Sequence, residues 1–243
     1  MATREGEMVD DVAAANVALL IQRRMSGESV ARIIGDKEFY GLAFALNAAT
    51  LEPRPDTELL VDLAIKALPQ GGKLLDLGTG TGCIPIAILA NRPDARALAS
   101  DLNPQALNMA RQNAERHEVT QRLDFAQGDW FGALGQTADR FDLIVSNPPY
   151  IASAVIDTLS PEVKAFDPML ALDGGPDGLG PYRIIVAQSG AHLKPGGQVL
   201  VEIGYDQGEA VAALFAEHGF ADIGVHKDLN GIDRVISAHQ IGR

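Results

Sequence analysis

Lys73-Leu74-Leu75-Asp76-Leu77-Gly78-Thr79-Gly80-Thr81-Gly82 is the stretch of this 243-residue sequence that decides the fold. Its apolar first half predicts a buried strand over 73–77, and its glycines predict a tight loop that lets backbone approach a ligand closely. A helix through Ala90 is predicted to follow. From Gly71 onward, predicted strands and helices alternate, which is typical of an α/β fold with a doubly wound, mostly parallel sheet. Ligands bind such sheets at the carboxyl ends of the strands.

The next three predicted strands also end in polar or aromatic residues. They are followed by Asp101, by Asp129 and Trp130, and by Asn147. Asp101 lies about 20 residues beyond the first glycine, where an acid typically holds ribose hydroxyls. Asp129 can accept from the amine of an adenine, and Trp130 can pack on its ring. The sequence therefore predicts a site for an adenine-containing cofactor at this edge of the sheet.

The glycine spacing discriminates between two such cofactors. A dinucleotide fingerprint reads G-x-G-x-x-G, whereas Gly78, Gly80 and Gly82 give G-x-G-x-G. Asp76 is poorly suited to a pyrophosphate but suits a cofactor with an amino or cationic end. We therefore predict S-adenosylmethionine, with a nicotinamide dinucleotide as the alternative. The predicted cofactor-binding residues are Asp76, Gly78, Thr79, Gly80, Thr81, Gly82, Asp101, Asp129, Trp130 and Asn147.

Phe141-Asp142-Leu143-Ile144-Val145-Ser146-Asn147-Pro148-Pro149-Tyr150 is a second informative stretch. It reads as a buried strand that runs into a rigid turn, because the prolines fix the backbone beyond Asn147. The Asn147 side-chain oxygen and the Pro148 carbonyl are two acceptors for an –NH2 group, and Tyr150 adds a flat wall. We predict Asn147, Pro148 and Tyr150 as catalytic residues, and these three with Pro149 as substrate contacts. The alternative is a strand end and proline turn without chemistry.

The chain is expected to divide into three parts. Residues 1–30 are predicted to form a helical N-terminal segment, with an amphipathic helix over 8–26. Residues 31–58 are predicted to form a hairpin and a Pro-Arg-Pro linker, and residues 59–243 the catalytic domain.

Local signals predict how these parts begin, end and turn. Asp10 or Asp11 is predicted to cap the first helix, and Asp56 or Thr57 the helix over 58–68. Arg54, between two prolines, could steer a substrate or form a surface ion pair. Residues 151–180 are rich in Pro, Gly and Asp and are expected to be an ordered loop over the site. A turn is predicted over 194–197, before a strand over 198–203.

Composition and charge restrict the partners. The net charge of −12 opposes binding to phosphate backbones, so we expect no stable nucleic-acid partner. No apolar run approaches the ~20 residues of a membrane span, and the first residues lack a signal-peptide pattern. A single cysteine, Cys83, fits a reducing cytoplasm and excludes a cysteine cluster for zinc, and no metal site is predicted.

Several of these stretches together resemble a known family. Asp76–Gly82, Asp101 and Asn147–Tyr150 are similar to class I S-adenosylmethionine-dependent methyltransferases that act on amino groups. Four more resemble the protein N5-glutamine methyltransferases, over roughly residues 31–240 in all. They are Phe39–Leu42, Pro53–Glu58, Ala171–Leu179 and Asp228–Arg234.

The resemblance implies a Rossmann-like sheet of seven strands and a peptide-chain release factor as protein substrate. The methylated residue would be the glutamine of its Gly-Gly-Gln motif. The resemblance also implies cofactor contacts at Gly78–Gly82, Asp101, Trp130 and Asn147, and substrate contacts at Asn147–Tyr150.

The sequence departs from this family pattern in places. Ala43 stands where proline is usual, Glu52 where an apolar residue is usual, and Met169 where arginine is common. The family also carries a longer helical N-terminal domain that helps to dock the release factor. Two alternatives follow: residues 1–30 are a truncated form of that docking domain, or this chain docks its partner differently.

The mechanism expected from these residues is alignment rather than strong acid–base catalysis. Asn147 and the Pro148 carbonyl would accept the two amide hydrogens and direct the nitrogen toward the methyl group. Three alternatives remain: a ribosomal-protein glutamine methyltransferase, a nucleic-acid adenine N6-methyltransferase, and a binding protein that keeps the fold as a scaffold. The negative charge disfavours the second, and the intact Asn147–Tyr150 and glycine motifs disfavour the third.

Overall fold

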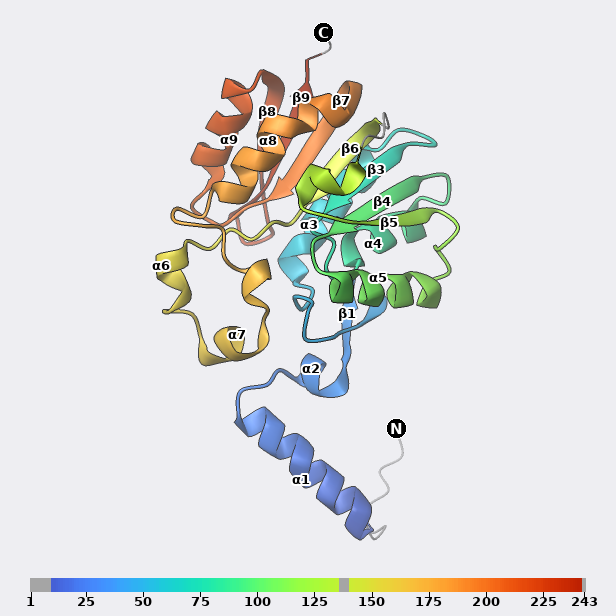
Figure 1. The fold of residues 1–243 in the computed structure, drawn as a ribbon, viewed down its shortest axis with the longest axis vertical. Coiled ribbons are helices and arrows are strands. Elements are labelled where there is room, and N and C mark those ends of the chain that lie inside the picture. Colours follow the sequence, from blue (N-terminus) through green and yellow to red (C-terminus); the bar gives the residue numbers. More distant parts are fainter. Residues whose placement is uncertain (1–9, 136–139, 242–243) are drawn as a thin grey trace.

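The computed structural model describes residues 10–135 and 140–241 (Figure 1). Its α-helices are α1 (Asp11–Met25), α2 (Val30–Ile34), α3 (Glu58–Ala67), α4 (Cys83–Asn91), α5 (Pro104–Arg116), α6 (Ser153–Ile156), α7 (Pro161–Phe166), α8 (Gly180–His192) and α9 (Gly208–Glu217). The 3-10 helices are η1 (Pro55–Thr57), η2 (Trp130–Leu134) and η3 (Met169–Ala171). The strands are β1 (Asp36–Phe39), β2 (Leu42–Ala45), β3 (Lys73–Leu77), β4 (Arg96–Asp101), β5 (Leu123–Gln127), β6 (Phe141–Ser146), β7 (Leu193–Glu202), β8 (Phe220–Lys227) and β9 (Asp233–Gln240).

Seven strands form one sheet in the order β5-β4-β3-β6-β7-β9-β8, as Figure 1 shows. The strands from β5 to β7 pair in parallel, and β9 pairs antiparallel with both β7 and β8. The predicted doubly wound, mostly parallel seven-stranded sheet of the class I methyltransferase type is confirmed. Strand order reverses at β3, with β4 on one side and β6 on the other, and the loops after β3 and β6 therefore frame a crevice.

Apolar side chains fill both faces of the sheet. α3, α4 and α5 pack against one face, and α8 and α9 pack against the other (Figure 1). All of Cys83–Leu89 in α4 is buried, because this helix lies between the sheet and the neighbouring helices α3 and α5. The carboxyl ends of the central strands are thus fixed between two packed layers.

The N-terminal part is attached to this body more loosely. None of the residues of α1 is buried, and Figure 1 shows the helix projecting away from the sheet. The Asp10 side chain caps it by accepting from the Ala13 N–H at 2.7 Å, as predicted. Residues 8 and 9 of the predicted helix lie outside the described residues. No helix within the described ranges is long and apolar enough to cross a membrane.

The hairpin β1–β2 was predicted, and its buried Phe39 and Phe44 join the core under α3. Glu52 is buried too, although it replaces an apolar residue of the family pattern. Its carboxylate accepts from the Ser29 hydroxyl at 2.6 Å and pairs with Lys37 at 3.1 Å, so the charge is compensated.

Three local predictions were wrong. Thr57 occupies the predicted N-cap position of α3, but its side chain makes no capping hydrogen bond, because the chain enters α3 through the 3-10 turn η1. Residues 194–197 do not form a separate turn. They belong to β7, where a register shift against β6 absorbs the extra residues. The segment 151–180 is not merely a loop, since it contains α6, α7 and η3.

Candidate active site

A cavity of about 420 Å³ lies at the carboxyl ends of β3, β4 and β6. Nine of the residues predicted from the sequence line it, and four do not. The nine are Gly78, Thr79, Gly80, Thr81, Asp101, Asp129, Trp130, Asn147 and Pro149. The four outside the lining are Asp76, Gly82, Pro148 and Tyr150. Most of the predicted site residues therefore line one cavity at the carboxyl edge of the sheet.

The glycine loop after β3 is held by backbone contacts with β4. The N–H groups of Gly78 and Thr79 both donate to the Ser100 carbonyl, each at 2.9 Å. Gly78 and Gly80 have φ of 74° and 56°, a left-handed conformation that favours glycine. A Cβ at either position would have no atom within 4 Å, so this backbone is open toward the cavity. Gly82 instead begins α4 and packs closely on Ala110.

Asp101 is oriented by two backbone donors. One carboxylate oxygen accepts from the Gly80 N–H at 2.9 Å, and the other accepts from the Asn103 N–H at 2.9 Å. Burial raises the pKa of Asp101, and these backbone hydrogen bonds oppose the rise. The carboxylate thus joins the glycine loop to the end of β4 and still lines the cavity.

Asp129 and Trp130 lie on the opposite side of the opening from the proline turn, after β5. Trp130 has φ of 47° and begins η2, and its ring packs on the core cluster beneath α8. A left-handed backbone is unusual for a bulky residue and costs on the order of 1–3 kcal/mol. The surroundings therefore hold the Trp130 ring at the edge of the cavity.

The proline turn after β6 presents Asn147 to the same cavity. The Asn147 Nδ2 donates to the Thr57 hydroxyl oxygen at 3.2 Å. Since the amide is planar, this bond leaves Oδ1 on the other side of the group. The Tyr150 carbonyl accepts from Gln207 Nε2 at 3.0 Å, which fixes the far end of the turn. Burial raises the pKa of the Tyr150 hydroxyl to about 12, so it stays protonated at neutral pH.

Asp76 does not line the cavity. Its side chain is completely buried, and neither carboxylate oxygen has a well-aligned hydrogen-bond partner among the described residues. Burial raises the pKa of Asp76 to about 7, and the Thr79 hydroxyl opposes this rise. Asp76 could therefore contact a cofactor only if the glycine loop shifted or if another group bridged its carboxyl to the cofactor.

Two further residues lie at the site. The sequence left open whether one of them, Glu202, faces the site or is a buried hydrogen-bonded carboxylate. Thr57 was interpreted as a helix cap, and it contacts Asn147 instead. Glu202, at the end of β7, is 2% exposed, and its Oε2 has no well-aligned hydrogen-bond partner among the described residues. Thr57 and Asn147 lie close enough to oppose the rise that burial causes in the pKa of its carboxyl. Only the pairing of β7 with β6 brings Glu202 to Asn147, so no local sequence signal could have shown this contact.

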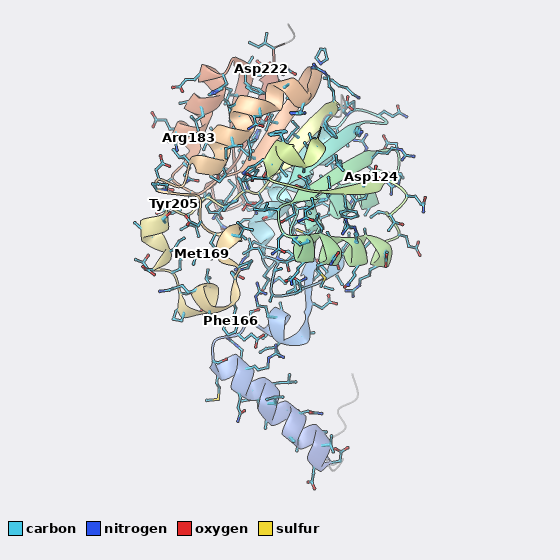
Figure 2. All side chains as sticks on the ribbon, viewed as in Figure 1. Asp124, Phe166, Met169, Arg183, Tyr205 and Asp222 are labelled. Atoms are coloured by element: carbon cyan, nitrogen blue, oxygen red, sulfur yellow. The ribbon has the colours of Figure 1, made fainter. Side chains whose placement is uncertain are left out.

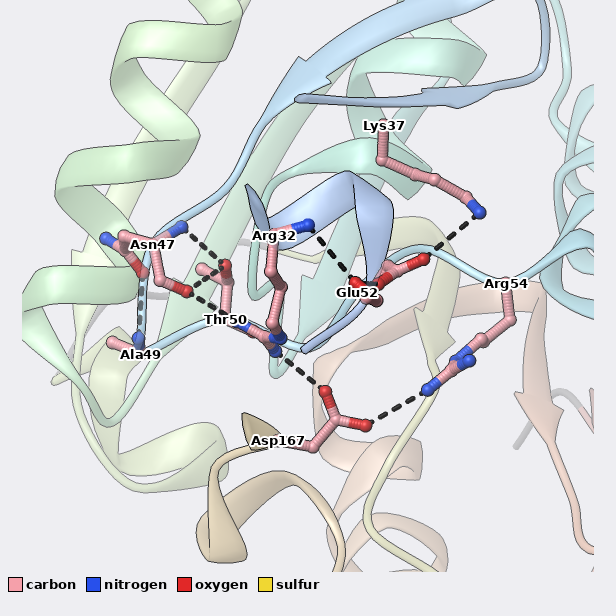
Figure 3. Close-up of polar contacts among 9 residues, drawn as sticks. Arg32, Lys37, Asn47, Ala49, Thr50, Glu52, Arg54 and Asp167 are labelled. Atoms are coloured by element: carbon pink, nitrogen blue, oxygen red, sulfur yellow. Dashed lines mark hydrogen bonds and ion pairs between the residues drawn. The ribbon is translucent and has the colours of Figure 1, made fainter. Parts of the chain in front are cut away.

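An ion-pair cluster lies next to the cavity, and Figure 3 shows Asp167 between Arg32 and Arg54. The buried Asp167 carboxylate pairs with Arg32 at 2.7 Å and with Arg54 at 3.0 Å. Arg54 was predicted either to steer a substrate or close over a cofactor, or to form a surface ion pair. It pairs with the buried Asp167 and also lines the cavity, so the functional alternative stays a prediction. Asp167 thereby connects the segment 151–180 to the N-terminal part.

Comparisons with known proteins agree with this geometry. Residues 54–162 match the family model described as the methyltransferase small domain. A protein of Agrobacterium fabrum named release factor glutamine methyltransferase is 47% identical over 229 residues, 92% of this chain and 78% of that protein. A protein of the same name from Rhodospirillum rubrum is 49% identical over 222 residues, 91% of this chain and 67% of that protein.

A solved structure supports the fold. The crystal structure of a methyltransferase from Pyrococcus furiosus aligns with a TM-score of 0.62, covering 94% of this chain and 99% of that chain. Because the two sequences are only 15% identical, this likeness shows the fold alone.

Proposed function

The chain belongs to the family of release factor glutamine methyltransferases, and on that premise we propose that it methylates the N5 nitrogen of a glutamine in a peptide-chain release factor. The methyl donor is S-adenosylmethionine, and the target is the glutamine of the Gly-Gly-Gln motif. The reaction belongs in the cytoplasm, which the single free cysteine supports.

The observation that carries this proposal is the orientation of the Asn147 amide. Its Nδ2 is engaged by Thr57, and Asn147 lines the cavity, so Oδ1 can accept from a substrate –NH2 group. The Pro148 carbonyl is the second proposed acceptor, and Tyr150 the flat wall. A planar primary amide matches two acceptors on a rigid turn, and a hydroxyl substrate would satisfy only one of them.

The residues around the cavity fit S-adenosylmethionine. Gly78 and Gly80 leave the backbone open to close approach, and the Asp101 carboxylate, held by the Gly80 N–H, would accept from ribose hydroxyls. Trp130 and Asp129 line the same cavity and would offer an adenine a stacking surface and an acceptor. The remaining cofactor contacts proposed are Asp76, Thr79, Thr81, Gly82 and Asn147. When bound, S-adenosylmethionine supplies a methyl group already activated by its sulfonium.

The chain's own contribution is alignment. An amide nitrogen is a poor nucleophile, because its lone pair is delocalised into the carbonyl. Acceptors at Asn147 and Pro148 would fix the plane of the amide and stabilise positive charge that develops on the nitrogen. Holding two reactants in line can supply several kcal/mol, up to about 7–11 by effective-molarity estimates. No strong general base is required, because a proton can leave after transfer.

The rim of the cavity suits a protein loop. Leu170 is 54% exposed and lines the cavity, and the neighbouring Met169 is equally exposed. Figure 2 shows Met169 on the segment before α8. Exposed apolar side chains beside a cavity favour a partner that buries them, and a release-factor loop is the proposed partner.

Methyl transfer from labelled S-adenosylmethionine tests the proposal. The substrates are a purified release factor and its Gly-Gly-Gln→Gly-Gly-Ala variant, with a ribosomal protein fraction and DNA as comparators. We expect label on the first substrate only. Label on the ribosomal fraction alone would mean that the substrate is a ribosomal protein and not a release factor. Label on DNA would overturn the proposal.

Asn147→Ala tests the proposed role of its amide. We expect kcat to fall by about 10²–10³, the usual cost of removing one preorganised polar group at a reacting centre. The dissociation constant of S-adenosylmethionine should change much less. Ser189→Ala is the matched control, because it removes a buried hydroxyl in α8, away from the cavity. Near-normal turnover of Asn147→Ala would contradict the mechanism.

A further inference from the structure

Three side chains from separate elements meet beneath the cavity. Thr57 ends η1, Asn147 follows β6, and Glu202 ends β7. The register pairs Ser146 with Val201, so the next residues along these parallel strands, Asn147 and Glu202, are neighbours. Thr57 is 3% exposed and Glu202 is 2% exposed, so water cannot readily replace the contacts between them.

An asparagine amide has two ends of nearly the same shape, and only its hydrogen bonds decide which end faces a substrate. The Thr57 hydroxyl has one hydrogen to donate and lone pairs with which to accept. If its hydrogen goes to the Glu202 carboxylate, its oxygen can only accept from Asn147 Nδ2. The observed Nδ2 to Oγ1 distance of 3.2 Å fits this direction.

We propose that Glu202 and Thr57 form a positioning pair that turns the Asn147 amide oxygen toward the substrate amide. The inference rests on the proposed function and deepens it. Neither residue touches the reacting atoms, and both act through Asn147. A carboxylate at Glu202 makes Thr57 a donor to it, Thr57 then accepts from Nδ2, and Oδ1 is left for the substrate.

Protonation of Glu202 would reverse the direction of these hydrogen bonds. A carboxylic acid can donate to Thr57, and Thr57 can then donate to the amide oxygen of Asn147 and turn the amide round. Burial raises the pKa of Glu202 to about 7, while Thr57, Arg234 and Asn147 oppose the rise. The reversal of the hydrogen bonds is therefore expected near pH 7.

The other charged and titratable groups around Glu202 come from several elements. Arg234 on β9 favours the carboxylate, and it is itself paired with Asp56 at 3.0 Å and with Asp228 at 3.2 Å. Asp56 disfavours the carboxylate. Three further groups interact with the Glu202 carboxyl: Tyr150 on the proline turn, Tyr182 on α8 and Cys83 on α4. Burial raises the pKa of all three above their ordinary values, so Glu202 is the group among these that titrates near neutrality.

Kinetics of four variants test the positioning pair. Thr57→Val removes the hydroxyl and keeps the shape, and we expect kcat to fall about 10-fold, the worth of roughly one hydrogen bond. Thr57→Ser should restore most of kcat. Glu202→Gln should remove the acid limb of the kcat–pH profile near pH 7. Ser189→Ala should keep that limb, and all four should bind S-adenosylmethionine with nearly the wild-type dissociation constant.

A second measurement does not depend on activity. In the free protein, the side-chain NH2 resonances of Asn147, assigned by their loss in Asn147→Asp, should shift as pH crosses 7. The shift should be absent in Glu202→Gln and in Thr57→Val. If no glutamine substrate is methylated but this shift is present, the proposed function fails and the positioning pair stands. Wild-type kcat in Thr57→Val, or resonances that titrate unchanged in Glu202→Gln, would overturn the pair.

Discussion

Asp76 shows how strongly one buried carboxyl can respond to its surroundings. It lies in β3 with no exposed surface, and its oxygens have no well-aligned partner among the described residues. Burial raises its pKa to about 7. Because the folded state then binds a proton that the unfolded state has already released, stability falls as pH rises from about 4 to 7.

Asp76→Asn should therefore become relatively more stable as pH rises. At pH 5 both side chains are neutral in the folded state, whereas at pH 8 only the asparagine stays neutral. The difference in free energy of unfolding between variant and wild type, from urea titrations, should grow from pH 5 to pH 8. Asp124→Asn on the exposed surface of β5 is the control (Figure 2), and it should stay within about 0.5 kcal/mol throughout. A difference independent of pH would contradict this account.

Individual residues of the site were predictable to different degrees. Parallel strands end at one edge, so residues that follow predicted strands, such as Asp101 and Asn147, were correctly expected to meet there. Thr57 was not expected there, and for Glu202 the sequence left a place at the site and a purely buried role equally open. The positions of both depend on the tertiary pairing of β6 with β7 and on the path of η1. Asp76 remains a predicted cofactor contact, and its burial shows that a polar residue next to a glycine loop need not face the opening.

At the scale of elements, the segment between β6 and α8 depends on a single carboxylate. The Asp167 side chain is 5% exposed and lies between Arg32, 8% exposed, and Arg54 (Figure 3). Removing one member of a buried ion pair leaves the other charge uncompensated, which costs about 3–5 kcal/mol. The ion pair of Asp167 with Arg32 thus connects the segment that carries α7 to α2.

Asp167→Ala should lower the free energy of unfolding by about 3 kcal/mol. Hydrogen exchange should also speed up over residues 161–171, because their tie to the N-terminal part is lost. Asp157→Ala is a matched control in the same segment, since that side chain is 95% exposed and its ion pair with Lys164 spans 3.7 Å. It should change stability by less than about 0.5 kcal/mol. If the two variants had equal effects, the ion pairs of Asp167 would not be what connects this segment to the N-terminal part.

The elements themselves were largely predictable where their periodicity was clear. β3, β5 and β6 lie where apolar runs predicted strands. The early start of β7 was not predictable, because Pro195 and two glycines signal a turn and only the register shift against β6 accommodates them. The short helices of 151–180 likewise depend on tertiary contacts, since helices this short have little stability of their own.

For the whole molecule, charge decides which large partners are excluded. The net charge is −12, and cations such as Arg92, Arg183 and Lys194 each pair with a carboxylate. Phosphate backbones gain affinity from unpaired cations that release counterions. A duplex or single-stranded oligonucleotide should therefore bind no more tightly than about 10⁻⁴ M in 0.15 M salt, the weak end of non-specific binding.

Fluorescence anisotropy with labelled oligonucleotides measures this directly. The same titration with a labelled release factor is the positive comparison, because a protein loop can bury the apolar rim without needing a basic surface. Submicromolar binding of DNA or RNA would reopen the adenine methyltransferase alternative.

The position of β9 between β7 and β8 also bears on how the chain is made. A ribosome produces β8 before β9, yet β8 joins the sheet only through β9. Until residues 233–240 emerge, β7 has a bare edge, and Arg234 has not reached the neighbourhood of Glu202. A chain without residues 233–240 would therefore leave the edge of β7 unpaired, would leave β8 without a partner in the sheet, and would lack the Arg234 that favours the Glu202 carboxylate.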